Sequence, residues 1–177
     1  MYQNRLRTQE PWAGGEAPLR LEAGKRHTIV LSSPPRVETL LPAAGAGFYT
    51  YGPVNHRYGQ AHVVAAIAGF AAGWAREHPN WLIGIGDLSL RGGGDTPRHS
   101  SHKRGLDVDL RPLRMDGRHE PVTIREAAYS RERTRALAAE LSRQLALELI
   151  FFNDLRIQGV RRAAGHDNHL HLRFKPV

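Results

Sequence analysis

Two short segments alternate strictly between apolar side chains and side chains that can bind a metal or move a proton. They are residues 106–110 (LDVDL) and residues 169–174 (HLHLRF). Successive side chains of a β-strand point to opposite faces, so each segment predicts a half-buried strand with one apolar and one polar face. If the two strands are neighbours, His and Asp side chains from distant parts of the chain meet on the same face of a sheet.

The polar faces of these segments offer a set of zinc ligands. A zinc site in a hydrolase usually has three His or carboxylate ligands, and water takes the fourth position. Asp109 lies on the polar face of the first segment, and His102 precedes it by seven residues, across Gly105. A turn at this glycine would bring the imidazole back toward the carboxylate. With a histidine from the second segment, the sequence predicts one zinc ion held between the two strands.

The remaining sequence mixes helices and strands without regular βαβ alternation. Residues 90–97 are glycine-rich and predict a flexible loop that leads into a first histidine cluster, residues 98–110. A second cluster, residues 165–174, lies near the C-terminus. We therefore expect an α+β fold with an antiparallel central sheet flanked by helices. Apolar periodicity predicts helices over residues 60–78 and 131–149, and short apolar runs predict strands at 27–31, 48–51, 81–87 and 150–152.

Length and composition indicate one domain with an N-terminal arm. Residues 1–25 are rich in Gly, Pro, Glu and Arg without periodicity, which predicts a loosely ordered arm, and residues 26–177 are predicted to form a single domain. We expect neither a secretory leader nor a membrane span. The chain has no cysteine, which excludes disulfides, thiolate metal sites and thiol nucleophiles. Its net charge of +8 favours polyanions such as an acidic wall polymer, but no nucleic-acid-binding signature accompanies it.

These motifs resemble those of a known family of zinc peptidases. His102-x6-Asp109 with its internal glycine, followed by His169-x-His171 near the C-terminus, resembles the lysostaphin/D-Ala-D-Ala (LAS) metallopeptidases. Residues 86–94, 101–109 and 165–173 look like the penicillin-insensitive murein endopeptidase branch of that family. The resemblance extends over roughly residues 37–175.

The resemblance implies a LAS/hedgehog-like zinc peptidase domain with three protein ligands, His102, Asp109 and His171. It also places His169 where the family keeps its catalytic base. His166 matches a further active-site histidine of the endopeptidase branch.

Two residues of the first cluster have less defined roles. His99 matches a histidine that can bind metal peripherally, and the alternative is a solvent-exposed loop residue. We expect Asp107 to orient a ligand histidine through its free ring nitrogen, although a plain surface carboxylate fits the same pattern.

The expected function is that of a zinc-dependent murein endopeptidase, which cleaves D-alanine-containing peptide cross-links with a metal-activated water. Its partners would be peptidoglycan stem peptides, and its location the periplasm or cell envelope. The sequence leaves the oligomeric state and the export route open. Three alternatives also stay open: a D-Ala-D-Ala carboxypeptidase or dipeptidase of the same family, a phage or effector lysin with the same chemistry, and a basic polyanion-binding module without activity.

Overall fold

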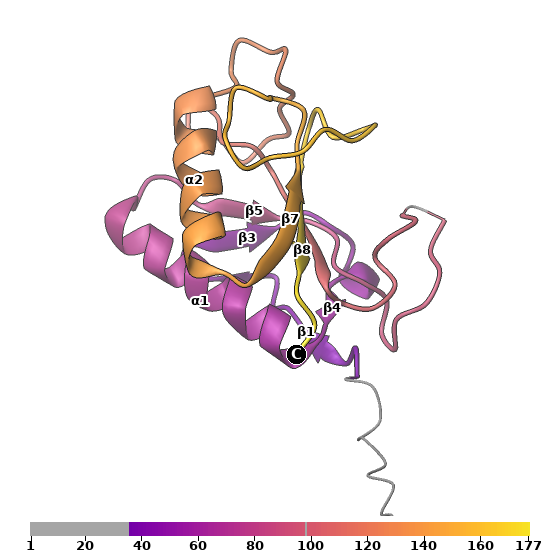
Figure 1. Cartoon of the computed structure of the whole chain (residues 1–177). Helices are drawn as coiled ribbons and strands as arrows, with labels where there is room; N and C mark the ends of the chain where they lie inside the picture. The colour runs from indigo at the N-terminus through magenta and orange to yellow at the C-terminus, as the bar shows by residue number, and fades with distance from the viewer. Residues whose placement is uncertain (1–35, 98) are drawn as a thin grey trace, which may run out of the picture. The chain divides into compact units, whose positions relative to one another are not determined.

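The computed structural model describes residues 36–97 and 99–177 (Figure 1). The predicted arm at residues 1–25 and the predicted strand at 27–31 lie outside the described residues. In chain order the elements are β1 (Thr39–Leu40), β2 (Ala44–Gly45), β3 (Phe48–Thr50), the 3₁₀ helix η1 (Val54–His56), β4 (Tyr58–Gly59), α1 (Ala61–Glu77), β5 (Ile83–Ile85), β6 (Asp107–Leu110), α2 (Arg131–Gln144), β7 (Leu147–Phe151) and β8 (Leu170–Phe174).

The helix α1 forms where apolar periodicity predicts it. Its apolar side chains recur at helical spacing, and Pro79 follows closely after its end because proline cannot continue a helix. The buried residues of α1 are Val63, Val64, Ile67, Phe70, Ala71 and Trp74. This face of the helix packs into the hydrophobic core.

The helix α2 begins at a capping serine and ends earlier than predicted. The Ser130 Oγ accepts a hydrogen bond from the backbone N–H of Arg133, which satisfies one free donor of the first turn. The helix ends at Gln144, so the prediction that it reaches Leu149 is wrong. Leu149 instead belongs to β7, which pairs with β8. The ladder with β8 outweighs the helical spacing of the leucines.

The central sheet has the strand order β2-β3-β5-β6-β8-β7, and β1 pairs with β4 in a separate two-stranded sheet. The predicted antiparallel arrangement is confirmed for every neighbouring pair except β3 and β5, which are parallel. Parallel neighbours need a long crossover, and the segment between β3 and β5 contains α1. The fold is α+β with one parallel pair inside the sheet.

The strand β6 is buried on both faces, so the prediction of a half-buried strand is wrong. Val108 and Leu110 lie in the hydrophobic core, while Asp107 and Asp109 are only 2 % and 5 % exposed. β6 lies between β5 and β8 in the sheet. A carboxylate buried in this way requires hydrogen-bond donors or a cation.

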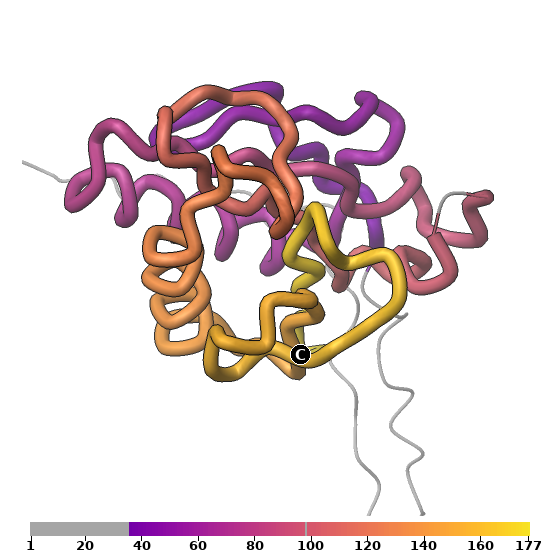
Figure 2. Tube along the Cα trace, turned by 90° about the horizontal axis from the view of Figure 1, so that it is seen from above, coloured from indigo at the N-terminus to yellow at the C-terminus, as the bar shows by residue number. Residues whose placement is uncertain are grey.

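The α2 helix and the loop that carries the first histidine cluster lie on opposite sides of the site strands. Figures 1 and 2 show α2 on one side of β7 and β8, and the loop segments of residues 90–97 and 99–105 on the other. Within the described part of the chain, no helix combines the length and apolar character that a membrane crossing needs.

Candidate metal centre

The register between β6 and β8 defines the centre of the site. The two strands are antiparallel neighbours, and Asp109 lies directly opposite His171. These residues are 62 positions apart in the sequence. Because directly opposite side chains of paired strands lie on the same face, the carboxylate and the imidazole meet at a buried point of the sheet.

Three potential ligand atoms meet at this point. His102 Nε2 lies 3.1 Å from His171 Nδ1 and 3.3 Å from Asp109 Oδ1, and the latter two atoms are 3.1 Å apart. His102 reaches the strand pair because Gly105 adopts a φ of 63°, which permits the expected turn before β6. We call these three atoms the acceptor triangle. All three residues are buried.

The outward nitrogens of both histidines have hydrogen-bond acceptors. His102 Nδ1 donates to the carbonyl oxygen of Leu88, and His171 Nε2 donates to Asp107 Oδ1 over 3.0 Å. A neutral imidazole that donates from one nitrogen carries a lone pair on the other. When both imidazoles are neutral in these tautomers, the three atoms of the acceptor triangle are all acceptors, and a cation bound between them would relieve their mutual repulsion.

The triangle fits a divalent transition metal in size and chemistry. Zn²⁺ binds histidine nitrogen and carboxylate oxygen at about 2.0–2.2 Å in tetrahedral geometry, which places donor atoms roughly 3.3 Å apart. The separations of 3.1–3.3 Å match this geometry. A carboxylate or a backbone carbonyl behind the ligand histidine is the usual outer support of such a site, and Asp107 and Leu88 provide one of each.

His99 adds a further imidazole beside the triangle. One ligand atom from each of His99, His102 and Asp109 lies within 4.8 Å of the others, so this group could hold a metal ion. His99 Nδ1 is 4.0 Å from Asp109 Oδ2, and its Nε2 is 2.7 Å from Oδ2 of Asp87. Asp87 is buried, and no role was predicted for it from the sequence. Its position at the end of an apolar strand segment is the sequence feature that could have indicated one.

His169 and His166 lie beside the triangle and outside it. His169 Nε2 is 3.8 Å from Asp109 Oδ1, and its Nδ1 contacts the side-chain oxygen of Asn168 at 2.8 Å. The rings of His166 and His169 are 4.6 Å apart between centroids. The strand β8 begins at Leu170, so His169 precedes the strand instead of opening it.

Burial and charge set the protonation of these groups. Burial opposes ionisation of Asp109, but hydrogen bonds from His102 and His171 hold its pKa well below the usual range. Burial lowers the pKa of His171, but its hydrogen bonds to Asp107 and Asp109 raise it to about 9. Burial also lowers the pKa of His169, against the attraction of Asp109. Without metal, His171 therefore carries a proton at neutral pH, and its positive charge faces Asp107 and Asp109.

Two open cavities border the histidines of the site. The first has a volume of about 310 Å³ and includes Asp109, and the second has a volume of about 290 Å³ and includes His171. His99, Gly165 and His169 line both cavities. Asp109 and His171 thus each border an open cavity.

The sequence that builds most of this site matches a family model. The model of the penicillin-insensitive murein endopeptidases matches residues 37–150 of the 177-residue chain. The chain belongs to this family. No curated protein matches it. The murein endopeptidases are enzymes that act on peptidoglycan, the polymer of the cell wall.

In this murein endopeptidase the match includes the first histidine cluster and ends before the second. His99, His102 and Asp109 lie inside the matched range, whereas His166, His169 and His171 follow it. The pairing of β8 with β6 brings the second cluster to the first. The two clusters therefore form one site through tertiary structure.

Proposed function

We propose that the chain is a zinc-dependent endopeptidase that hydrolyses D-alanine-containing peptide cross-links of peptidoglycan in the periplasm or cell envelope. The family supplies the class of reaction and the polymer. The observation that carries the metal-dependent mechanism is the acceptor triangle of His102, Asp109 and His171, with separations of 3.1–3.3 Å.

In this proposal His102, Asp109 and His171 would hold zinc, and His99 would be a peripheral ligand. When bound, zinc would act as a Lewis acid, which lowers the pKa of a coordinated water toward about 7 and polarises the scissile carbonyl. Asp107 orients His171, because the hydrogen bond to Nε2 turns the lone pair of Nδ1 toward the other ligand atoms.

His169 is the proposed general base. With Nδ1 donating to Asn168, the lone pair of its neutral imidazole is on Nε2, which lies 3.8 Å from Asp109 Oδ1. This nitrogen accepts the proton of the attacking water. His166 lines the second cavity beside His169 and serves as a donor, either to the oxyanion or to the leaving amine.

The proposal is tested by replacing His171 and His169 separately with alanine. His171→Ala is expected to lose both stoichiometric zinc and turnover of purified cross-linked muropeptides. His169→Ala is expected to retain zinc, while the rate falls by roughly 10²–10⁴. His62→Ala, on α1, is the matched control and should retain both. Turnover that persists in a zinc-free His171→Ala protein would reject the ligand assignment.

The presence of two open cavities that share His99, Gly165 and His169 favours an endopeptidase over a D-Ala-D-Ala carboxypeptidase. A cross-link continues beyond the scissile amide in both directions, so its hydrolysis needs space on each side. Mass spectrometry of products from cross-linked and uncross-linked muropeptides distinguishes the two activities. Release of terminal D-alanine without cleavage of the dimer would favour the carboxypeptidase.

A further inference from the structure

We propose that Arg111 binds a carboxylate of the stem peptide on the residue that follows the scissile amide. This inference rests on the proposed function, which supplies the class of substrate. It assigns to a residue outside the metal centre the recognition of a specific chemical group.

Arg111 lies at the wall of the cavity that contains the metal ligand Asp109. It directly follows β6, and its backbone N–H donates to the carbonyl oxygen of Gly84 over 2.9 Å. The guanidinium carbon lies 4.1 Å from the ring centroid of Tyr51. Tyr51, Arg111, Asp109 and His169 all line the cavity of about 310 Å³. A fixed positive charge therefore borders the space in which the scissile bond would lie.

The side chain of Arg111 is held in place. It packs over Tyr51, and its Nη1 donates to the carbonyl oxygen of His119. A Cβ at Gly84 would lie 3.2 Å from Arg111 Cδ and 2.6 Å from the hydroxyl of Tyr49, so the glycine leaves room for both side chains. The guanidinium has five N–H donors in a planar fork, and those that remain can bind a carboxylate with two parallel hydrogen bonds.

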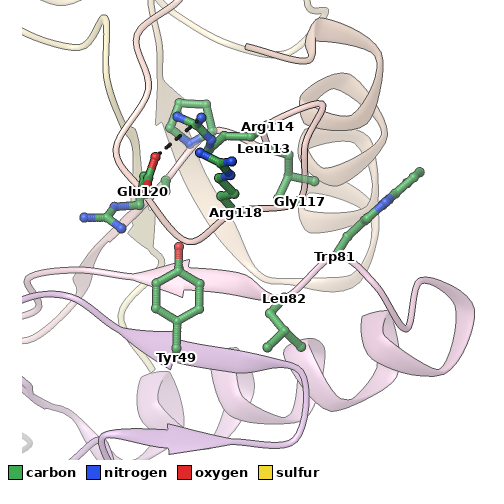
Figure 3. A pocket seen from close by; sticks show the side chains of 11 residues that line it. Tyr49, Trp81, Leu82, Leu113, Arg114, Gly117, Arg118 and Glu120 are labelled. Atoms are coloured by element: carbon green, nitrogen blue, oxygen red, sulfur yellow. Dashed lines mark ion pairs between the residues drawn. The ribbon is translucent and has the colours of Figure 1, made fainter. Parts of the chain in front are cut away.

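The charge of Arg111 is not neutralised within the described part of the chain, where no carboxylate forms an ion pair with it. The nearby Arg114 differs, because it pairs with Asp116 at 2.6 Å. It also lies 3.6 Å from Glu120 (Figure 3). Arg114 therefore has its anion already, whereas Arg111 retains its charge for a ligand.

A second hollow next to Arg111 is too small to be the binding site. Figure 3 shows this hollow, with Tyr49 on one side and Arg114 and Arg118 on the other. Its volume of about 20 Å³ holds a single water molecule. Of the cavities that Arg111 lines, the one with Asp109 is therefore the one that admits a peptide.

The chemistry of the substrate complements this arrangement. Peptidoglycan stem peptides are anionic, and a residue joined through its amine to D-alanine can carry a free carboxylate next to the scissile amide. Arginine matches the planar geometry of a carboxylate, whereas lysine provides only a point charge. Arg111 would thus both attract the substrate and fix the position of its amide relative to the metal ligands.

The test uses a cross-linked muropeptide dimer with a free carboxylate on the residue after the scissile amide, and the same dimer with a carboxamide there. Wild-type enzyme is expected to have a KM about 10- to 100-fold lower for the free carboxylate, with kcat similar for both. Arg111→Gln should remove this preference, and Arg111→Lys should retain part of it. Arg118→Gln, which removes the same charge outside this cavity, should keep the full preference.

Calorimetric titration of both dimers into metal-depleted protein measures the same preference without turnover. If the wild type binds with the preference but hydrolyses neither dimer, the proposed function fails and the assignment of Arg111 stands. The assignment is overturned if the wild type shows no preference, if Arg111→Gln retains it, or if Arg118→Gln loses it equally. Because each preference is a ratio within one variant, a partly unfolded variant still gives a valid result.

Discussion

Replacing Asp107 with asparagine tests whether a buried carboxylate behind the metal centre controls metal affinity. Asp107 Oδ1 accepts hydrogen bonds from Nε2 of His171 at 3.0 Å and from Nε of Arg173 at 2.8 Å. Asparagine has nearly the same shape but no charge. Its amide can also turn an NH₂ group toward His171, which favours the tautomer whose lone pair points away from the metal.

The size of the effect follows from these contacts. Loss of an outer partner of a ligand histidine lowers metal affinity by about 10- to 100-fold, which corresponds to roughly 1.4–2.7 kcal/mol. A hydrogen bond to a charged group contributes about 1.5–3 kcal/mol, and Asp107 is only 2 % exposed, so solvent screens it little. Arg173 also loses its anion, but its side chain is 25 % exposed, so this part adds about 1 kcal/mol or less to the destabilisation.

The assay is competition for zinc between the protein and a chromophoric chelator at neutral pH. Asp95→Asn is the matched control, because Asp95 is an exposed carboxylate that pairs with Lys103 at the surface. We expect the control to bind zinc like the wild type and Asp107→Asn to bind it about 10- to 100-fold more weakly. A folded Asp107→Asn protein with wild-type zinc affinity would refute the role of Asp107 in orienting His171.

Three further predictions follow from the site and its supports. Because the pKa of His171 is raised to about 9 in the metal-free protein, zinc must displace its proton below that pH. Zinc affinity should therefore rise about tenfold per pH unit up to pH 9 and then level off, with proton release measurable by calorimetry in two buffers. Gly105→Ala places a Cβ 2.7 Å from Val37 Cγ1 at a φ of 63°, so thermal unfolding should show a loss of about 1–3 kcal/mol, together with weaker zinc binding. Asp154→Ala leaves the buried hydroxyl of Tyr129 without its acceptor and should lower the free energy of unfolding in urea by about 3 kcal/mol.

The local sequence pattern was sufficient to predict the helices and strands whose apolar side chains recur with a clear period. The apolar spacing of residues 60–78 predicts α1 to within a residue of each end, because its buried stripe is a property of the helix alone. The alternation at residues 106–110 and 169–174 predicts β6 and β8 for the same reason. Where two patterns compete, the sequence was misleading: Leu149 continues the leucine spacing of α2, yet the ladder with β8 places it in β7.

The sequence by itself determined the chemistry that is available: histidines, carboxylates, a glycine turn and no cysteine, in motifs specific enough to indicate the family. Only the tertiary structure decided which of these groups meet. A period of two assigns a side chain to a face, but it does not say which strand or loop covers that face. The burial of β6 on both faces and the contact of Asp107 with His171 depend on contacts between distant segments. Those contacts arise from long-range strand pairing, which no local pattern encodes.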